Sequence, residues 1–278
     1  MLQIGKYNQL NVLEAGVYGI ILDGLDHGRL LLSRRLAPEN VDVGESLEVF
    51  VFLDAQGDPV PTTDRPAATV GQVAWLEVVE VNEVGAFVDW GLSKDLFIPF
   101  AEQQHALSKG RHTLVKVYLD NQGRLAGSTR IDHWIKDEPG NLTRGEKVDV
   151  IVGDKTELGF KAIINHESWG LLYSNELFQR ISKGQHLEAF VNRVRKDGKI
   201  DLSLTQPGFS QGKMDKASAA VLAAMEANQG FLPLTDKSPP EEIYARFKFS
   251  KKVFKQAVGV LYKARRITLE SDGIKLKK

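Results

Sequence analysis

The sequence of 278 residues contains no cysteine, which excludes disulfide bonds, thiolate zinc sites, iron–sulfur clusters and cysteine nucleophiles. It also lacks an apolar run near the roughly 18 residues that a membrane-spanning helix requires. The N-terminal residues show no basic segment followed by an apolar one, so we expect no secretory signal peptide. These absences predict a cytoplasmic protein that does not associate with a membrane.

Sequence motifs of catalysis and of metal or cofactor binding are missing as well. The six histidines are scattered, and none has the spacing to a second histidine or a carboxylate that is typical of a metal site. We find no phosphate-binding loop, dinucleotide-binding fingerprint or nucleophile elbow. We therefore expect no catalytic residues, no metal and no cofactor, and a protein that binds its partner without transforming it.

The formal net charge is zero, but the charge is distributed unevenly along the chain. Residues 1–66 hold 5 Lys and Arg against 10 Asp and Glu, giving −5, and residues 67–135 hold 6 against 8, giving −2. Residues 136–210 balance at 11 against 11, whereas residues 211–278 hold 14 against 7, giving +7. A basic C-terminal segment is typical of proteins that bind polyanions. The alternative is that it only increases solubility.

Glycines recur with a period of about seventy residues, which indicates tandem modules. Each of three sets contains a glycine before an apolar strand, a glycine opening a second strand and a glycine at a hairpin tip: Gly16, Gly44 and Gly57; Gly85, Gly110 and Gly123; Gly159, Gly184 and Gly198. Between them lie short alternating runs, such as Leu187, Ala189 and Val191. Such runs favour small five-stranded Greek-key barrels, in which closure removes the exposed sheet edges.

Segments rich in proline and glycine are expected to end the repeats, because neither residue continues a strand ladder well. These segments are 59–66, 137–141 and 206–208. We therefore predict a divergent barrel at 1–66, a second barrel at 67–135 and a third, the most regular, at 142–206.

After residue 210 the pattern changes to that of helices. We predict an amphipathic helix over 213–228, a second helix capped by Ser238 and a third capped by Ser250. The apolar face expected for the third helix consists of Phe254, Val258, Leu261 and Tyr262. Residues 267–276 contain an Asp-Gly turn and predict a β-hairpin. Three helices and a hairpin predict a winged-helix domain at 211–278.

The third repeat resembles the S1 RNA-binding domain in three segments, Gly159–Ile163, Gly170–Leu177 and Gly198–Leu204, and the second repeat resembles it in Gly85–Val88. Together with the C-terminal segment at 239–259, the whole chain resembles the bacterial conserved virulence factor B family. The resemblance implies a mainly β fold, with tandem S1/OB-type five-stranded barrels followed by an α+β winged-helix domain. It also implies RNA binding and a regulatory role.

The S1 pattern places two aromatic residues on the RNA-binding face, where they stack on bases. By our alignment the first position holds Tyr18, Phe87 and Lys161, and the second holds Leu32, Ile98 and Tyr173. We expect Tyr173 to be the main contact, and Phe97 and Phe160 to face the core. The alternative for Tyr18 and Phe87 is that each fills a barrel or an interdomain contact.

Basic residues lie near both expected binding regions. The hairpin of the third repeat carries Arg193, Arg195, Lys196 and Lys199, which would contact phosphates together with Lys161. The third helix of the winged-helix domain carries Lys251, Lys252, Lys255, Lys263 and Arg266 in the recognition position. Lysine acts as a point charge, so we expect contacts to the nucleic-acid backbone with low sequence specificity. The alternative is a solvated lysine face.

These observations predict an RNA-binding regulatory protein that binds single-stranded RNA through the third barrel and the winged helix, in post-transcriptional regulation. The alternative is a transcription regulator that binds duplex DNA through the winged helix and uses the barrels as protein-interaction modules. A third hypothesis is that the acidic first barrel contacts the ribosome or RNA polymerase.

Overall fold

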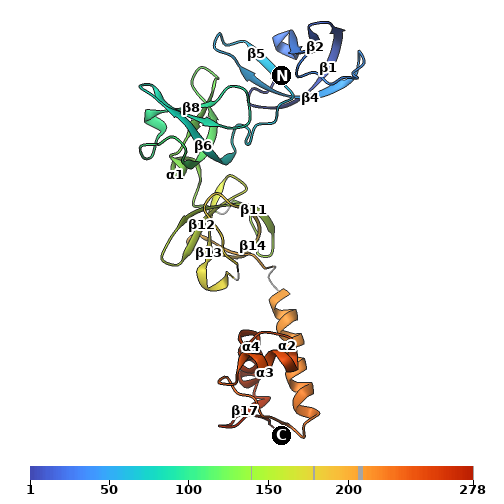
Figure 1. Ribbon diagram of the computed structural model, residues 1–278, viewed down its shortest axis with the longest axis vertical. Coiled ribbons are helices and arrows are strands. Elements are labelled where there is room, and N and C mark those ends of the chain that lie inside the picture. The colour runs from blue at the N-terminus through green and yellow to red at the C-terminus, as the bar shows by residue number, and fades with distance from the viewer. Residues whose placement is uncertain (139, 178, 206–208, 278) are drawn as a thin grey trace. The chain divides into compact units, whose positions relative to one another are not determined.

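The computed structural model describes residues 1–138, 140–177, 179–205 and 209–277 (Figure 1). Pro139 of the predicted second linker, the whole predicted linker Gln206–Gly208 and Lys278 lie outside the described residues. The chain divides into two compact units, one of residues 1–143, 148–189 and 193–202 and one of residues 144–147, 190–192 and 203–278. The residue ranges of the four domains expected from the sequence remain a prediction. No helix among the described residues is both long and apolar enough to span a membrane.

The first repeat folds into an antiparallel sheet with the order β3-β2-β1-β4-β5. Its strands are β1 (Lys6–Gly16), β2 (Gly19–Asp23), β3 (Arg29–Ser33), β4 (Ser46–Leu53) and β5 (Pro59–Thr62), with a 3-10 turn at Leu25–His27. Alternate residues such as Leu10, Val12, Leu22 and Leu32 are buried and form the core. This alternation is the period of two that a half-buried strand requires.

The second repeat forms a sheet with the order β10-β9-β6-β7-β8. Its strands are β6 (Val73–Val81), β7 (Gly85–Asp89), β8 (Leu96–Pro99), β9 (His112–Leu119) and β10 (Leu125–Ser128), followed by the short helix α1 (Ile131–Trp134). A 3-10 turn lies at Phe100–Glu102. Phe50 of the first repeat packs edge-on against Trp90 of this one, with ring centroids 5.9 Å apart, so the two cores are continuous.

The third repeat is a closed barrel with the order β11-β12-β13-β15-β14. Its strands are β11 (Lys147–Lys155), β12 (Gly159–Ile164), β13 (Ser168–Tyr173), β14 (His186–Val194) and β15 (Ile200–Ser203), with a 3-10 turn at Ser174–Glu176. Strands β13 and β15 pair in parallel and close the barrel. The prediction of a mainly β chain with five-stranded, barrel-like units is confirmed.

The C-terminal region is the predicted winged-helix fold. It contains α2 (Phe209–Glu226), β16 (Phe231–Leu232), α3 (Pro240–Phe247), α4 (Lys251–Lys263), β17 (Ile267–Leu269) and β18 (Ile274–Leu276). Ser250 caps α4 as predicted, accepting a hydrogen bond from the amide of Val253 at 3.4 Å. The predicted Ser238 cap is wrong: Pro239 is the N-cap of α3, and the Ser238 hydroxyl accepts from Thr235 instead. Tyr262, predicted to be in the core, is 53% exposed.

The second and third barrels meet at a junction that includes a half-buried histidine. Val73, Leu114, Ile131, Ile151 and Ile163 belong to one apolar cluster at this junction. The turn between β12 and β13 enters it, with His166 in a left-handed conformation at φ +63°. The His166 Nδ1 atom accepts a hydrogen bond of 3.0 Å from the Val73 amide. The His166 carbonyl accepts one of 3.0 Å from the ammonium of Lys116, which is only 8% exposed. The bond from Val73 requires the Nδ1 atom of His166 to be unprotonated, whereas the backbone carbonyl accepts in either state of the ring.

We expect this junction to weaken as the pH falls. Burial lowers the pKa of His166 below its ordinary value of 6.5, Lys116 and His186 lower it further, and Asp149 partly opposes them. Because the docked state disfavours the proton, its stability is complete above the ordinary pKa and is lost as the pH falls below it. Protection of the Val73 amide from hydrogen exchange, corrected for the intrinsic rate, should therefore decrease from pH 8 to pH 5. His166→Asn, which tolerates the left-handed backbone, should flatten this dependence. Equal pH profiles for the two proteins would contradict the prediction.

Candidate functional site

Strand pairing gives the equivalent positions of the three repeats. In each repeat, the glycine that opens the second strand pairs with the last residue of the third strand: Gly19 with Ser33, Gly85 with Pro99 and Gly159 with Tyr173. A Cβ atom on these glycines would lie 2.1, 2.5 and 1.9 Å from a carbonyl oxygen of the third strand, on Leu32, Ile98 and Leu172 respectively. These contacts are too short for any side chain, so each repeat needs glycine at this position.

The alignment of the first repeat made from the sequence is therefore wrong by three residues, because Gly19 and not Gly16 is the counterpart of Gly85 and Gly159. Tyr18 lies in the turn before β2 and is 86% exposed. The true counterpart of Phe87 in the first repeat is Ile21.

The second aromatic position was misaligned by one residue in two repeats. Leu32 and Ile98 point into their barrels and are both fully buried, at 0% exposure. The counterparts of Tyr173 are the neighbouring residues Ser33 and Pro99. Neither can stack on a base as an aromatic ring does, so the first two repeats have no equivalent of Tyr173.

Tyr173 lies at the end of β13 on the outer face of the third barrel, partly exposed. Its hydroxyl donates a hydrogen bond of 3.1 Å to Asp201 Oδ1 and accepts one from the Arg195 guanidinium. Burial raises the pKa of the Tyr173 phenol, and the negative charge of Asp201 raises it further. Tyr173 is therefore a neutral phenol, held at its distal end by two charged neighbours.

Asp201 completes this group and was not predicted from the sequence. It lies on β15 opposite Leu171, its neighbour on the parallel strand β13. Arg195 Nε donates to both carboxylate oxygens at 3.0 and 3.1 Å, and Arg195 Nη2 donates to Oδ1 at 2.6 Å. A sequence signal existed: Asp201 occupies a position where the S1 pattern Gly-Arg-Ile-Ser-Leu-Ser-Leu has serine.

The hairpin between β14 and β15 carries the remaining predicted cations of the third repeat. Arg195 and Lys199 flank its turn, where the Arg195 amide donates to the Lys199 carbonyl at 2.8 Å. Arg193, Lys196 and Lys199 are exposed, and Lys199 lies 3.9 Å from Asp197. The hairpin thus presents exposed charges beside the guanidinium of Arg195, which Asp201 and Tyr173 hold.

Lys161 shares the outer face with Tyr173 but points toward the second barrel. Its ammonium lies 2.9 Å from Asp132 Oδ1 and 3.9 Å from the centre of the Trp169 ring. These contacts hold Lys161 in a hollow of about 210 Å³ lined by both barrels. The structure brings Tyr173, Arg195 and Asp201 together, but it places the charge of Lys161 in this separate contact.

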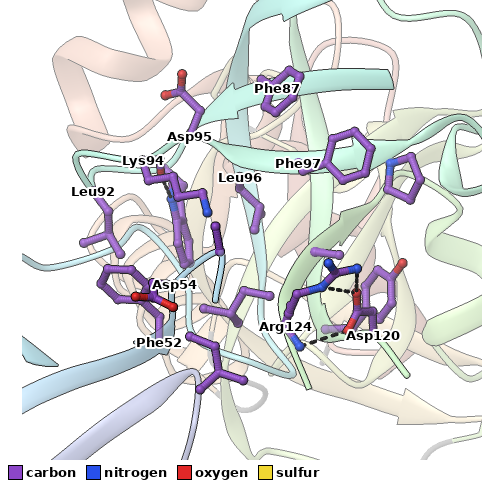
Figure 2. A pocket seen from close by; sticks show the side chains of 17 residues that line it. Phe52, Asp54, Phe87, Leu92, Lys94, Asp95, Leu96, Phe97, Asp120 and Arg124 are labelled. Atoms are coloured by element: carbon purple, nitrogen blue, oxygen red, sulfur yellow. Dashed lines mark hydrogen bonds and ion pairs between the residues drawn. The ribbon is translucent and has the colours of Figure 1, made fainter. Parts of the chain in front are cut away.

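Phe87 lines a pocket of about 520 Å³ between the first and second barrels (Figure 2). Its ring contacts that of Phe97, with centroids 5.2 Å apart, and Phe52 of the first barrel lines the same pocket. Phe97, predicted to face the core, is half-buried in this pocket instead, because its neighbours Leu96 and Ile98 take the inward positions. Phe87 therefore lines a hollow shared by two barrels and not an open strand face.

Charged groups in the same pocket are largely acidic or paired. Arg124 donates to Asp120 Oδ2 at 3.0 and 2.8 Å, the ion pair drawn in Figure 2. Asp54 and Asp95 add two carboxylates, and Lys94 adds one cation. Burial raises the pKa of Asp95, and repulsion from Asp89 and Glu80 raises it further. This pocket offers aromatic walls, but its three carboxylates outnumber its two cations.

In the winged-helix domain, the predicted basic residues lie on and just beyond α4. Lys252, Lys255, Lys263 and Arg266 are exposed and Lys251 is half-buried, whereas Phe254, Val258 and Leu261 form the buried face. Lys255 lies 3.6 Å from Asp236. The helix therefore separates a basic face from an apolar one, as the sequence indicated.

The part of the chain that the structure describes contains no cluster of three or more His, Asp or Glu side chains arranged for a metal ion.

Two family models match the chain. The S1 domain model matches residues 4–64 and 70–130, and the CvfB-like winged helix domain model matches residues 219–276. These matches confirm S1 domains and the winged helix, and both domain types support nucleic-acid binding. The S1 matches cover the first two repeats, so the third is assigned from its motifs and its closed barrel.

Curated relatives extend over most of the chain. "Uncharacterized protein YitL" of Bacillus subtilis is 27% identical, covering 96% of this chain and 91% of that protein. "Conserved virulence factor B" of Staphylococcus aureus is 23% identical, covering 86% of this chain and 82% of that protein. The predicted resemblance to conserved virulence factor B is confirmed.

Among solved structures, a multidomain protein with nucleic acid binding domains from Streptococcus pneumoniae is similar. The two sequences are 24% identical. The match covers 99% of this chain and 98% of that chain, with a TM-score of 0.40.

We expect the glycine positions to respond differently to substitution. Gly19→Ala should destabilise the first barrel by roughly 1–3 kcal/mol, the usual cost of overpacking, because the new Cβ meets the Leu32 carbonyl and the backbone φ is +147°. Gly16→Ala is the matched control, since its Cβ would have its nearest atom 3.8 Å away. Urea unfolding of both variants measures the difference. Equal stability of the two would contradict the corrected alignment.

Proposed function

We propose that this chain, which combines S1 domains with a CvfB-like winged helix domain as a relative of conserved virulence factor B, binds single-stranded RNA. The binding surface is the outer face of the third barrel, assisted by the basic face of α4. The protein acts in post-transcriptional regulation in the cytoplasm and catalyses no reaction. The observation that carries the proposal is the placement of Tyr173 beside Arg195 and the exposed cations of the same hairpin.

The chemistry of this face suits an unpaired nucleotide. A partly exposed phenol ring supplies a surface on which any base can stack, and such stacking contributes about 1–3 kcal/mol per base. Exposed Arg193, Lys196 and Lys199 can follow the phosphates on either side. Bases in a duplex are already stacked, so this arrangement favours single strands over double strands.

The winged helix supplies a second contact of a different kind. The basic face of α4 is mostly lysine, which attracts phosphates without the fixed fork that reads a base edge. It should therefore raise affinity with little sequence preference. The same face is what a duplex-DNA regulator would use, so duplex DNA is the competing ligand in the experiment below.

The first two barrels have a different role in this proposal. The first carries a net charge of −5 and has Ile21 and Ser33 where stacking residues would lie. Phe87 of the second lines a pocket shared with the first. We assign these barrels to scaffolding and to contacts with a protein partner, for which the ribosome and RNA polymerase are the candidates.

Tyr173→Ala should weaken binding of an unstructured 12-residue RNA about tenfold, the effect of losing one stacking contact. Tyr18→Ala is the control, since this tyrosine lies at an exposed turn, and it should bind like the wild type. Fluorescence anisotropy at fixed salt measures both. The proposal fails if the wild type does not bind the RNA, or if duplex DNA displaces it at equal concentration.

The salt dependence of binding should report the hairpin cations. Replacing Arg193, Lys196 and Lys199 by glutamine should reduce the slope of log K against log salt by about 2, because each phosphate contact to a single strand contributes roughly 0.7. Lys109→Gln with Arg111→Gln removes exposed charge from the second barrel and should leave the slope unchanged. Equal slopes for the triple variant and the wild type would exclude the hairpin from the phosphate contacts.

A further inference from the structure

Asp201 is an unusual residue for the surface on which it lies. A face that binds a polyanion is expected to avoid carboxylates, yet Asp201 lies on the outer row of β15 beside Leu171 of β13. The residue is only 9% exposed. Counted from the hairpin glycine of each repeat, the same position holds Val60 and Ala126 in the first and second repeats. A buried charge is costly unless it is paired, so its partners explain its presence.

The partners of Asp201 are the two side chains proposed to meet RNA. Its Oδ1 atom accepts from the Tyr173 hydroxyl and from Arg195 Nε and Nη2, and its Oδ2 atom accepts from Arg195 Nε. The same guanidinium donates to the Tyr173 hydroxyl. The three side chains therefore form a closed ring of hydrogen bonds in which every member contacts the other two.

This ring fixes the directions of both neighbours. The guanidinium of Arg195 is oriented by a carboxylate fork, and the Tyr173 ring is fixed at its distal end, far from its backbone. A side chain that is already ordered loses less conformational entropy when a ligand binds. At the same time, the charge of Asp201 offsets that of Arg195, so the value of Arg195 to a ligand is in its position more than in its charge.

The second repeat has a related pair without this consequence. There the pair uses different positions: Asp120 stands at the position of Arg195, and its partner Arg124 stands at that of Lys199 and not at that of Asp201. The residue equivalent to Tyr173 is Pro99, so no phenol is held. Both hairpins thus carry an ion pair, but from different positions, and in the third repeat the pair also holds an aromatic ring.

We infer that Asp201 is a positioning residue, which holds Tyr173 and Arg195 in the orientation that receives single-stranded RNA. The inference rests on the proposed function. The inference predicts that removal of the Asp201 charge weakens RNA binding. Simple electrostatics predicts the opposite, because removal of a negative charge strengthens binding to a polyanion.

The first test compares two substitutions that remove the same charge from the same hairpin region. Asp201→Asn should weaken binding of the 12-residue RNA about tenfold, as expected when a stacking platform loses its support. Asp197→Asn removes an exposed carboxylate from the turn, and its amide oxygen can still accept from the Lys199 amide. It should bind RNA as tightly as the wild type, or up to about twofold more tightly. Equal or tighter binding by Asp201→Asn overturns the inference.

A second variant changes geometry without changing charge. Arg195→Lys keeps both charges of the pair but loses the planar fork. It should weaken RNA binding severalfold while the slope of log K against log salt stays at the wild-type value. Because it retains a cation for Asp201, it tests the inference even if Asp201→Asn fails to fold. Wild-type affinity of Arg195→Lys overturns the inference.

A measurement without RNA separates this inference from the proposed function. In the full chain, the Nε–H resonance of Arg195 should be slow to exchange with water in the wild type and in Asp197→Asn, and fast in Asp201→Asn. Slow exchange in Asp201→Asn would show that the carboxylate does not hold the guanidinium, and the inference would fall. If exchange follows the expectation but the wild type does not bind RNA, the positioning role stands and the proposed ligand is wrong.

Discussion

The close approach of one glycine in each repeat to the neighbouring strand determines which side chains reach the outer face. Gly19, Gly85 and Gly159 each lie where a Cβ atom would collide with a carbonyl oxygen of the third strand. This contact fixes the register between the second and third strands, and a shift of one residue would exchange their inner and outer faces. Tyr173 faces outward because Leu172, its neighbour, is committed to the core. The surface that we propose for RNA therefore depends on a backbone contact that contains no functional group.

With the register fixed, the repeats are free to differ on their outer faces. The first has Ile21 and Ser33 at the two aromatic positions, the second has Phe87 and Pro99, and the third has Lys161 and Tyr173. Packing between barrels uses some of these positions: Phe87 lines the pocket beside the first barrel, and Lys161 is paired with Asp132 of the second repeat. The outer face of a barrel thus contributes to packing between barrels, and in the third repeat it is also the surface that we propose for RNA. Similar folds need not share a function.

The sequence predicted most features that depend on local chemistry. The glycine at each hairpin tip, the Ser250 cap and the helix–hairpin order of the C-terminal domain follow from residues close together in the chain. The alignment of the first repeat failed because glycines stand on both sides of its turn, at 16 and 19, and only strand pairing distinguishes them. The ion pair of Asp201 with Arg195 joins residues only six apart, but the link of Asp201 to Tyr173 spans 28 residues and could be seen only in the fold. The ion pair of Lys161 with Asp132 was missed for the same reason, since it joins residues 29 apart.

Charge and position have separate roles in the third barrel. The exposed cations of the hairpin act over several ångströms, lose strength as salt increases and need no defined orientation. Arg195 is different, because Asp201 neutralises much of its charge while fixing its direction. Such a pair contributes little to long-range attraction but lowers the ordering cost of the final contact. In the function that we propose, a surface that combines the two attracts RNA loosely and then holds one base firmly, although the net charge of the repeat is near zero.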